Sequence, residues 1–158
     1  MAVSNKKYLQ TVFNTTAAMG DKVVSSDATL EIEGFEYLSL LIKQFPWPEL
    51  SPGGEIEIPM PMGLMRWQPQ QLKINQQGPI QIMETKKGHV AKFLEDILIQ
   101  GAIFNAKVYE GTPEDYTRVE PLKSCFVQLD NPDRDWENRS QIMLLSGTLF
   151  YHYLGSNT

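Results

Sequence analysis

The side chains best suited to chemistry in this chain are two histidines and a single cysteine. His89 and His152 lie far apart in the sequence, and neither belongs to a Cys or His cluster with the spacing of metal ligands. Cys125 lies in an apolar run, which is typical of a small buried side chain and not of a reactive thiol. These residues therefore predict no metal site and no nucleophile.

A run of acidic residues is the next candidate, because clustered carboxylates can bind calcium. Its members are Asp130, Asp133, Asp135 and Glu137. An EF-hand loop needs a glycine at its sharp turn and a glutamate that closes the loop, and this segment has neither. Solvated loop carboxylates are therefore the favoured interpretation.

Glycine motifs that mark nucleotide or acyl-transfer chemistry are also missing. Gly53, Gly54 and Gly111 belong to no phosphate-binding loop, dinucleotide fingerprint or nucleophile elbow. Two distant carboxylates that converge in a cleft are the enzymatic alternative that stays open. The sequence thus predicts a protein that is not an enzyme and needs no cofactor.

The size and charge of the chain limit its partners. Its 158 residues are enough for one domain with a continuous core, and one cysteine cannot form an internal disulfide. The net charge of −5 disfavours tight binding of nucleic acid, which requires clustered Lys and Arg. No apolar stretch reaches the ~18 to 20 residues of a membrane span, so we expect a soluble protein with no membrane partner.

Most segments that would have to position a site alternate polar and apolar residues, as β-strands do. Strands are predicted at residues 29–33, 35–43, 102–109, 122–129 and 141–154, the last with a bend or bulge at Ser146 and Gly147. Apolar residues at helical spacing predict one amphipathic helix over residues 89–100, which ends at Gly101. Residues 1–27 lack a sustained period and predict a loosely structured N-terminal arm.

These elements predict a mainly β (α+β) fold. We expect a single domain over residues 28–158, built as an antiparallel β-sandwich or barrel with one packed α-helix. A long proline-rich loop and the flexible N-terminal arm would complete it.

The long loop spans residues 44–70, where prolines disfavour both helix interiors and central strands. A short strand is predicted within it at residues 55–58. Its large apolar side chains are Phe45, Trp47, Met60, Met62, Leu64, Met65 and Trp67. Either this loop folds back onto its own core, or it contacts a neighbouring subunit, since methionine and aromatic residues are enriched at interface centres.

Residues 71–85 are predicted to form a β-hairpin with its turn at Gln76-Gln77-Gly78-Pro79. One face of this hairpin is apolar. The opposite face carries mostly uncharged polar residues, which include Gln71, Lys73, Asn75, Gln77 and Gln81. An ordinary solvent-exposed face of an antiparallel sheet has the same composition.

Taken in order, these elements resemble the tail tube (inner tube) proteins of contractile-tailed bacteriophages and related injection machines. The resemblance runs over residues 28–155 and rests mainly on layout. It also rests on the strands around Glu31-Ile32-Glu33-Gly34-Phe35 and on the closing strand Ser146-Gly147-Thr148-Leu149-Phe150-Tyr151-His152-Tyr153.

The resemblance implies a structural subunit, six copies of which close into a ring. Stacked rings would enclose a channel for DNA and the tape-measure protein, with the tail sheath outside and baseplate proteins at one end. It implies assembly in the bacterial cytoplasm and a final location in the virion, the phage tail. The apolar residues of the 44–70 loop would then join stacked rings.

The same resemblance implies that the polar face of the predicted hairpin lines the channel, without specific binding of DNA. Lys73 departs from a uniformly repulsive lining. Two alternatives stay open: a baseplate or tail-completion protein with a tube-like fold, and a small β-barrel enzyme or ligand-binding module with a deep polar pocket.

Overall fold

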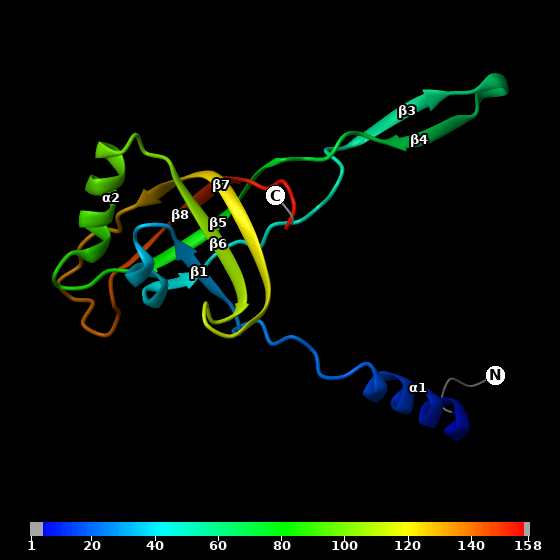
Figure 1. The fold of residues 1–158 in the computed structure, drawn as a ribbon, viewed down its shortest axis with the longest axis horizontal. Coiled ribbons are helices and arrows are strands. Elements are labelled where there is room, and N and C mark those ends of the chain that lie inside the picture. The colour runs from blue at the N-terminus through cyan, green and yellow to red at the C-terminus, as the bar shows by residue number, and fades with distance from the viewer. Residues whose placement is uncertain (1–4, 157–158) are drawn as a thin grey trace.

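The computed structural model describes residues 5–156, and six of its strands form one antiparallel sheet. The strands follow the order β1-β6-β7-β8-β5-β2, and the sheet curves until it nearly closes into a barrel (Figure 1). Their bounds are β1 (Thr29–Ile32), β2 (Ile42–Gln44), β5 (Asn75–Met83), β6 (Phe104–Gly111), β7 (Tyr116–Asp130) and β8 (Leu144–His152). The predicted mainly β fold is confirmed.

The inside of the barrel is filled by alternate side chains of these strands, because successive side chains of a strand point to opposite faces. The buried set includes Leu30 and Ile32 in β1, Ile80 and Ile82 in β5, Ala106 and Val108 in β6, Leu122 and Cys125 in β7, and Leu145 and Leu149 in β8. Cys125 is thus a small core side chain, as predicted.

One end of the barrel is covered by the amphipathic helix α2 (His89–Ile99), which matches the predicted helix closely. Val90, Phe93 and Ile97 are buried in the core. The ring of Phe93 lies 5.0 Å from the ring of Phe35 and packs edge-on against it. Aromatic pairs in this arrangement add to the free energy of burial and fix the helix over the barrel end.

A short 3-10 helix, η1 (Glu36–Leu40), contacts both edge strands β1 and β2. The strand predicted over residues 35–43 is therefore wrong in its first half. Phe35 and Leu38 are both buried and lie three residues apart, which suits the three-residue turn of a 3-10 helix. Extended strand structure, in which successive side chains alternate between two faces, begins only at β2.

The hairpin predicted over residues 71–85 is also wrong, because β5 is one unbroken strand. It pairs with β8 from Asn75 opposite His152 to Met83 opposite Leu144. A Cβ atom on Gly78 would lie 2.3 Å from Cβ of Pro46, so the glycine makes room for the segment that crosses β5. Pro79 is tolerated because β2 pairs with β5 only from Gln81 onward.

The bend predicted at Ser146 and Gly147 is absent, since β8 keeps a continuous register with β5 there. A Cβ atom on Gly147 would lie 1.9 Å from the carbonyl oxygen of Gln128 in β7. The glycine therefore permits close approach of two strands. The irregularity lies in β7 instead, between Lys123 and Phe126.

Two extensions leave the barrel on the side away from α2 (Figure 1). One is a hairpin of β3 (Glu55–Pro59) and β4 (Met65–Pro69), which turns through the short 3-10 segment η2 (Pro61–Gly63). The other is the helix α1 (Lys6–Ala18), in the segment predicted to be loosely structured. Asn5 caps α1, and its Oδ1 accepts hydrogen bonds from the backbone N–H groups of Lys7 and Tyr8.

We expect Gly78→Ala and Gly147→Ala each to lower the free energy of unfolding by about 1–3 kcal/mol, because the added methyl group overlaps Pro46 or the Gln128 carbonyl. Chemical denaturation with a matched Ser146→Ala control, at an exposed position of β8, measures the effect. An unchanged midpoint in both glycine variants would contradict the close packing described here.

Candidate assembly surfaces

The residues that could do chemistry do not come together in the described part of the chain. Within residues 5–156, no group of three or more His, Cys, Asp or Glu side chains is arranged to hold a metal ion. Cys125 is fully buried, and burial raises the pKa of its thiol to about 12. A thiol with so high a pKa stays protonated near neutral pH and is a poor nucleophile.

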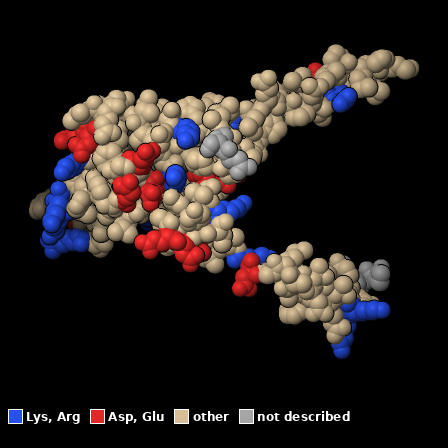
Figure 2. Space-filling model, viewed as in Figure 1, with Lys and Arg blue, Asp and Glu red and all other residues tan. Residues whose placement is uncertain are grey.

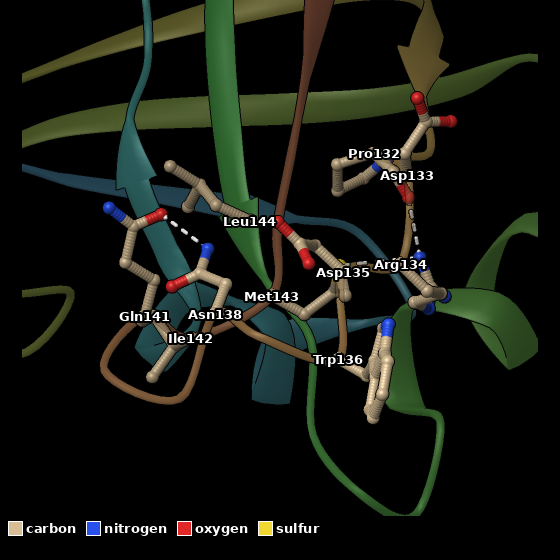
Figure 3. Close-up of a pocket in the computed structure, with 10 residues that line it drawn as sticks. All are labelled: Pro132, Asp133, Arg134, Asp135, Trp136, Asn138, Gln141, Ile142, Met143 and Leu144. Atoms are coloured by element: carbon tan, nitrogen blue, oxygen red, sulfur yellow. Dashed lines mark hydrogen bonds between the residues drawn. The ribbon is translucent and has the colours of Figure 1, made fainter.

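The acidic run lies beside an open hollow of about 400 Å³ formed by the loop between β7 and β8 (Figure 3). Arg134 organises this loop, since its Nη1 donates hydrogen bonds to Oδ1 of Asn131 at 2.8 Å and to the carbonyl oxygen of Pro132 at 2.6 Å. The carboxylates of Asp133 and Asp135 point apart in Figure 3. This loop therefore presents no converging set of acidic groups.

The largest exposed feature is a two-stranded arm that contains β3 and β4. Its pairing extends beyond the two strands, because the N–H of Lys73 donates to the carbonyl oxygen of Ser51 and the N–H of Gly53 donates to that of Gln71. The predicted long loop is thus an antiparallel ribbon from Ser51 to Lys73. The prediction of a short strand at residues 55–58 is confirmed, whereas its partner β4 was missed.

Five of the predicted interface residues lie on this arm, and none is buried. Their exposed fractions are 43% for Met60, 100% for Met62, 62% for Leu64, 52% for Met65 and 66% for Trp67. Figure 2 shows the arm as a projection with few charged atoms. Exposed apolar sets of this kind are typical of protein–protein or membrane contact sites.

Phe45 and Trp47 behave differently, because both are half-buried and pack against the barrel core. The segment that carries them is tied to β5 by Gln76, whose Nε2 donates to the carbonyl oxygen of Glu49 at 2.7 Å. The Oε1 atom of Gln76 accepts from the N–H of Glu49 at 3.2 Å. The interpretation that the loop folds back onto its own core therefore holds for this part of it, and the arm does not follow it.

A second surface is the outward face of β5, β8 and β7. The predicted polar residues Asn75, Gln77 and Gln81 lie on β5 opposite His152, Phe150 and Ser146 of β8. The outward residues of β7 extend these rows, with Phe126 opposite Phe150 and Gln128 opposite Thr148. The rings of Phe126 and Phe150 stack at 4.7 Å.

Sequence reasoning missed the β7 and β8 half of this face, because only the register reveals which side chains share a row. Gln71 and Lys73 precede β5 and lie in the base of the arm, and Lys73 also lines a hollow beside this face with Asn75, Gln77 and His152. The outward rows that pair along β5, β8 and β7 carry two residues with fixed charge, Lys123 and Asp130. The surface is therefore polar but nearly neutral.

Two separate side-chain pairs lie at the end of the barrel next to the arm. Oη of Tyr153 donates to Oε2 of Glu120 at 2.5 Å, and its backbone N–H donates to the carbonyl oxygen of Ile74 at the arm base. Burial and the bond to Glu120 raise the pKa of Tyr153 to about 12. Nearby, the Arg118 guanidinium donates to Glu110 at 2.6 Å and lowers the pKa of that carboxyl.

The sequence matches no family model and no curated protein. Its fold does match solved structures. One match is a chain of the PVC extracellular contractile injection system, from its sheath–tube complex in the extended state. The two sequences are 16% identical and the TM-score is 0.55. The match covers 87% of this chain and 92% of that chain. A chain of the PVC sheath/tube terminator, also in the extended state, is 13% identical with a TM-score of 0.55, over 83% and 93% of the two chains.

A third match is the cap of the anti-feeding prophage, the AFP tube-terminating cap. It is 16% identical with a TM-score of 0.54, over 83% of this chain and 87% of that chain. These identities are low, so the matches establish a common fold and nothing finer. The fold is the one found in these tube and tube-terminator assemblies, in agreement with the resemblance drawn from the layout of the elements.

The raised pKa of Tyr153 predicts a specific loss of stability in alkali. The raised pKa means that the folded state favours the neutral phenol of Tyr153. The contribution of this phenol to the free energy of unfolding is therefore complete below pH 10 and is lost as the pH rises from 10 towards 12. We expect Tyr153→Phe to be less stable than the parent at pH 8 by about 1 kcal/mol, for loss of one hydrogen bond, and to lose less stability above pH 10.

Urea denaturation from pH 8 to pH 12 checks this expectation, with Tyr116→Phe as the control at an exposed tyrosine. Parallel curves for the parent and Tyr153→Phe across this range would contradict the role assigned to the Tyr153–Glu120 bond.

Proposed function

We propose that this chain is the repeating subunit of the inner tube of a contractile phage tail, a structural protein and not an enzyme. Hexameric rings of the chain stack around a channel through which DNA passes during ejection. The observation that carries the proposal is the exposed apolar arm on a barrel whose fold matches tube assemblies. Such an arm gains free energy only when another surface covers it.

The arrangement of the barrel supports self-association. An antiparallel sheet with free edges tends to pair with other chains, and ring closure covers such edges. Here β1 and β2 are the edge strands of the six-stranded sheet. In the proposed tube, the arm reaches from one ring to the next, so that Met60, Met62 and Trp67 are buried between stacked rings.

The outward face of β5, β8 and β7 suits the lining of the channel. Amides, hydroxyls and a histidine share it with the stacked rings of Phe126 and Phe150, and a nearly neutral surface offers DNA no strong electrostatic grip. The net charge of −5 on each of six copies adds a weakly repulsive field. Lys73 lies at the arm base and borders this lining, since it shares a hollow with Asn75, Gln77 and His152.

The proposal implies further partners. The tail sheath surrounds the tube, a suggestion supported by the match to a sheath–tube complex. The tape-measure protein occupies the channel before DNA, baseplate proteins hold one end, and the finished tail belongs to the virion. Assembly takes place in the cytoplasm of the host bacterium.

A tube terminator or baseplate protein with the same fold is the second candidate. The matches to a sheath/tube terminator and to a tube-terminating cap favour it as directly as the sheath–tube match favours the tube. The two candidates differ in one behaviour. A tube subunit polymerises by itself, whereas a terminator forms a single ring and stops growth.

Negative-stain microscopy of the pure chain at increasing concentration tests the proposal. We expect sixfold rings that stack into tubes. Single rings that never stack would favour the terminator, and a strictly monomeric sample at high concentration would overturn both candidates.

We expect the triple substitution Met60→Ser, Met62→Ser and Trp67→Ser to raise the concentration needed for tubes by at least about tenfold, because the apolar contact between rings is lost. The midpoint of unfolding of the monomer should stay unchanged, since all three side chains are exposed.

Gln77→Glu is the matched control, at an exposed position of the proposed lining. It should leave both assembly and folding intact. Tubes that form equally well with the triple variant would remove the arm from the stacking contact.

A further inference from the structure

The arm joins the barrel through two legs, which are residues 45–50 before it and residues 73–74 after it (Figure 1). We propose that Gln76 sets the direction of the arm, because its side-chain amide replaces a missing backbone pair where the legs meet β5. Gln76 is thus a positioning residue for assembly. The inference rests on the proposed function, in which the arm reaches a neighbouring ring in one direction.

The arm is the outer part of an antiparallel pairing that begins in the sheet. The strand β2 pairs with β5 as far as Gln44 opposite Gln81. Pairing resumes where the N–H of Lys73 donates to the carbonyl oxygen of Ser51, and it continues through β3 and β4. Among the described residues, no backbone–backbone hydrogen bond joins the two segments that lie between these stretches.

Proline accounts for the gap in the pairing. Pro46 and Pro48 have no N–H group to donate to a ladder, and Pro79 removes a donor from β5 itself. Pro46 instead packs against Gly78, where an added Cβ atom would lie 2.3 Å from Cβ of Pro46. The first leg therefore crosses β5 in close contact, without the hydrogen bonds that hold two strands in register.

Gln76 bridges the gap with its side chain. Its Nε2 donates to the carbonyl oxygens of Glu49 at 2.7 Å and of Lys73 at 3.2 Å. Its Oε1 accepts from the N–H of Glu49 at 3.2 Å. A primary amide offers the donor and acceptor of a peptide group and one further donor. Gln76 thus bonds the first leg as a neighbouring strand does, and it bonds the second leg as well.

The place of Gln76 in β5 favours these bonds over contacts with water. Gln76 is half-buried and belongs to the inward row of β5, which continues with Gly78, Ile80 and Ile82. A polar group that is partly withdrawn from water loses free energy when its partners are removed. Its neighbour Gln77 is exposed on the outward face, and its side chain forms no hydrogen bond within the described residues.

Few other contacts orient the arm. Within the described chain, no residue from Ser51 to Leu72 belongs to the core cluster. The second leg has one further bond to the barrel, from the N–H of Tyr153 to the carbonyl oxygen of Ile74. Among the described residues, Gln76 is the side chain that hydrogen-bonds to both legs.

A fixed direction strengthens association. A contact element that is already held in its bound orientation loses less entropy on binding, so its affinity is higher. An arm that swings keeps the exposed side chains of Met62 and Trp67 but meets the next copy in the required orientation for only part of the time. Gln76 therefore acts on assembly through the arm, without touching the partner.

Distances between spin labels test this role in the full-length chain. One label is attached at the arm tip through Met62→Cys and the other on β8 through Ser146→Cys, since both positions are exposed. The native Cys125 is buried and stays unlabelled. Labelled chains are diluted into unlabelled chains, so that pulsed electron paramagnetic resonance reports only distances within one copy.

Gln76→Met is the decisive variant, because methionine keeps an unbranched side chain but cannot form the amide hydrogen bonds. We expect a narrow distance distribution in the parent and one at least about twofold wider in Gln76→Met, since both legs lose their shared partner. Gln77→Met is the matched control on the outward face and should leave the distribution narrow.

Assembly provides a second readout. Gln76→Met should raise the concentration needed for tubes about tenfold, although the apolar side chains of the arm are intact. The same substitution should add little to the triple variant Met60→Ser, Met62→Ser and Trp67→Ser, because both changes act through the arm. A general folding defect would instead add its full effect in that background.

Each remaining outcome decides the question. A distribution that is broad in the parent, or that stays narrow in Gln76→Met, would overturn the inference. Tubes that form at an unchanged concentration with a widened distribution would also overturn it, while the proposed function stands. A parent chain that forms neither rings nor tubes would remove the proposed function, and widening in Gln76→Met would then still support Gln76 as the residue that orients the arm.

Discussion

The long pairing of β5 with β8 is the contact on which the rest of the structure depends. Its register, from Asn75 opposite His152 to Met83 opposite Leu144, decides which side chains face inward and which face outward. The side chain of Ile80 faces the core, whereas Gln77 and its partner Phe150 face outward. The same strand also separates the arm, which precedes it, from α2, which follows it.

The barrel alone does not account for the apolar content of the chain. Its interior is filled from strands, η1 and α2, while apolar side chains of the arm and α1 remain outside. Neither a two-stranded hairpin nor a short helix is stable by itself in water. In the proposed assembly, order in these extensions would be coupled to contacts with other copies, so that folding of the extensions and association would be parts of one process.

Local periodicity was enough to predict α2, most strands and the buried Cys125, because each signal lies within a few neighbouring residues. Gly78-Pro79 was misread as a turn, since the reason for the glycine is Pro46, far away in the sequence. Gly147 was misread as a bend for the same reason, with Gln128 as the distant contact. The outward row of Phe126 and Phe150 likewise needed a register that no local pattern contains.

The position of the two extensions has one more consequence. Both leave the barrel on the side away from α2, so the molecule has unlike front and rear surfaces (Figure 1). A chain of copies joined front to rear keeps this difference at its two tips. In the proposed tube, one tip would present free arms and helices and the other would present the α2 side of the barrel, so growth and capping at the two tips would require chemically different partners.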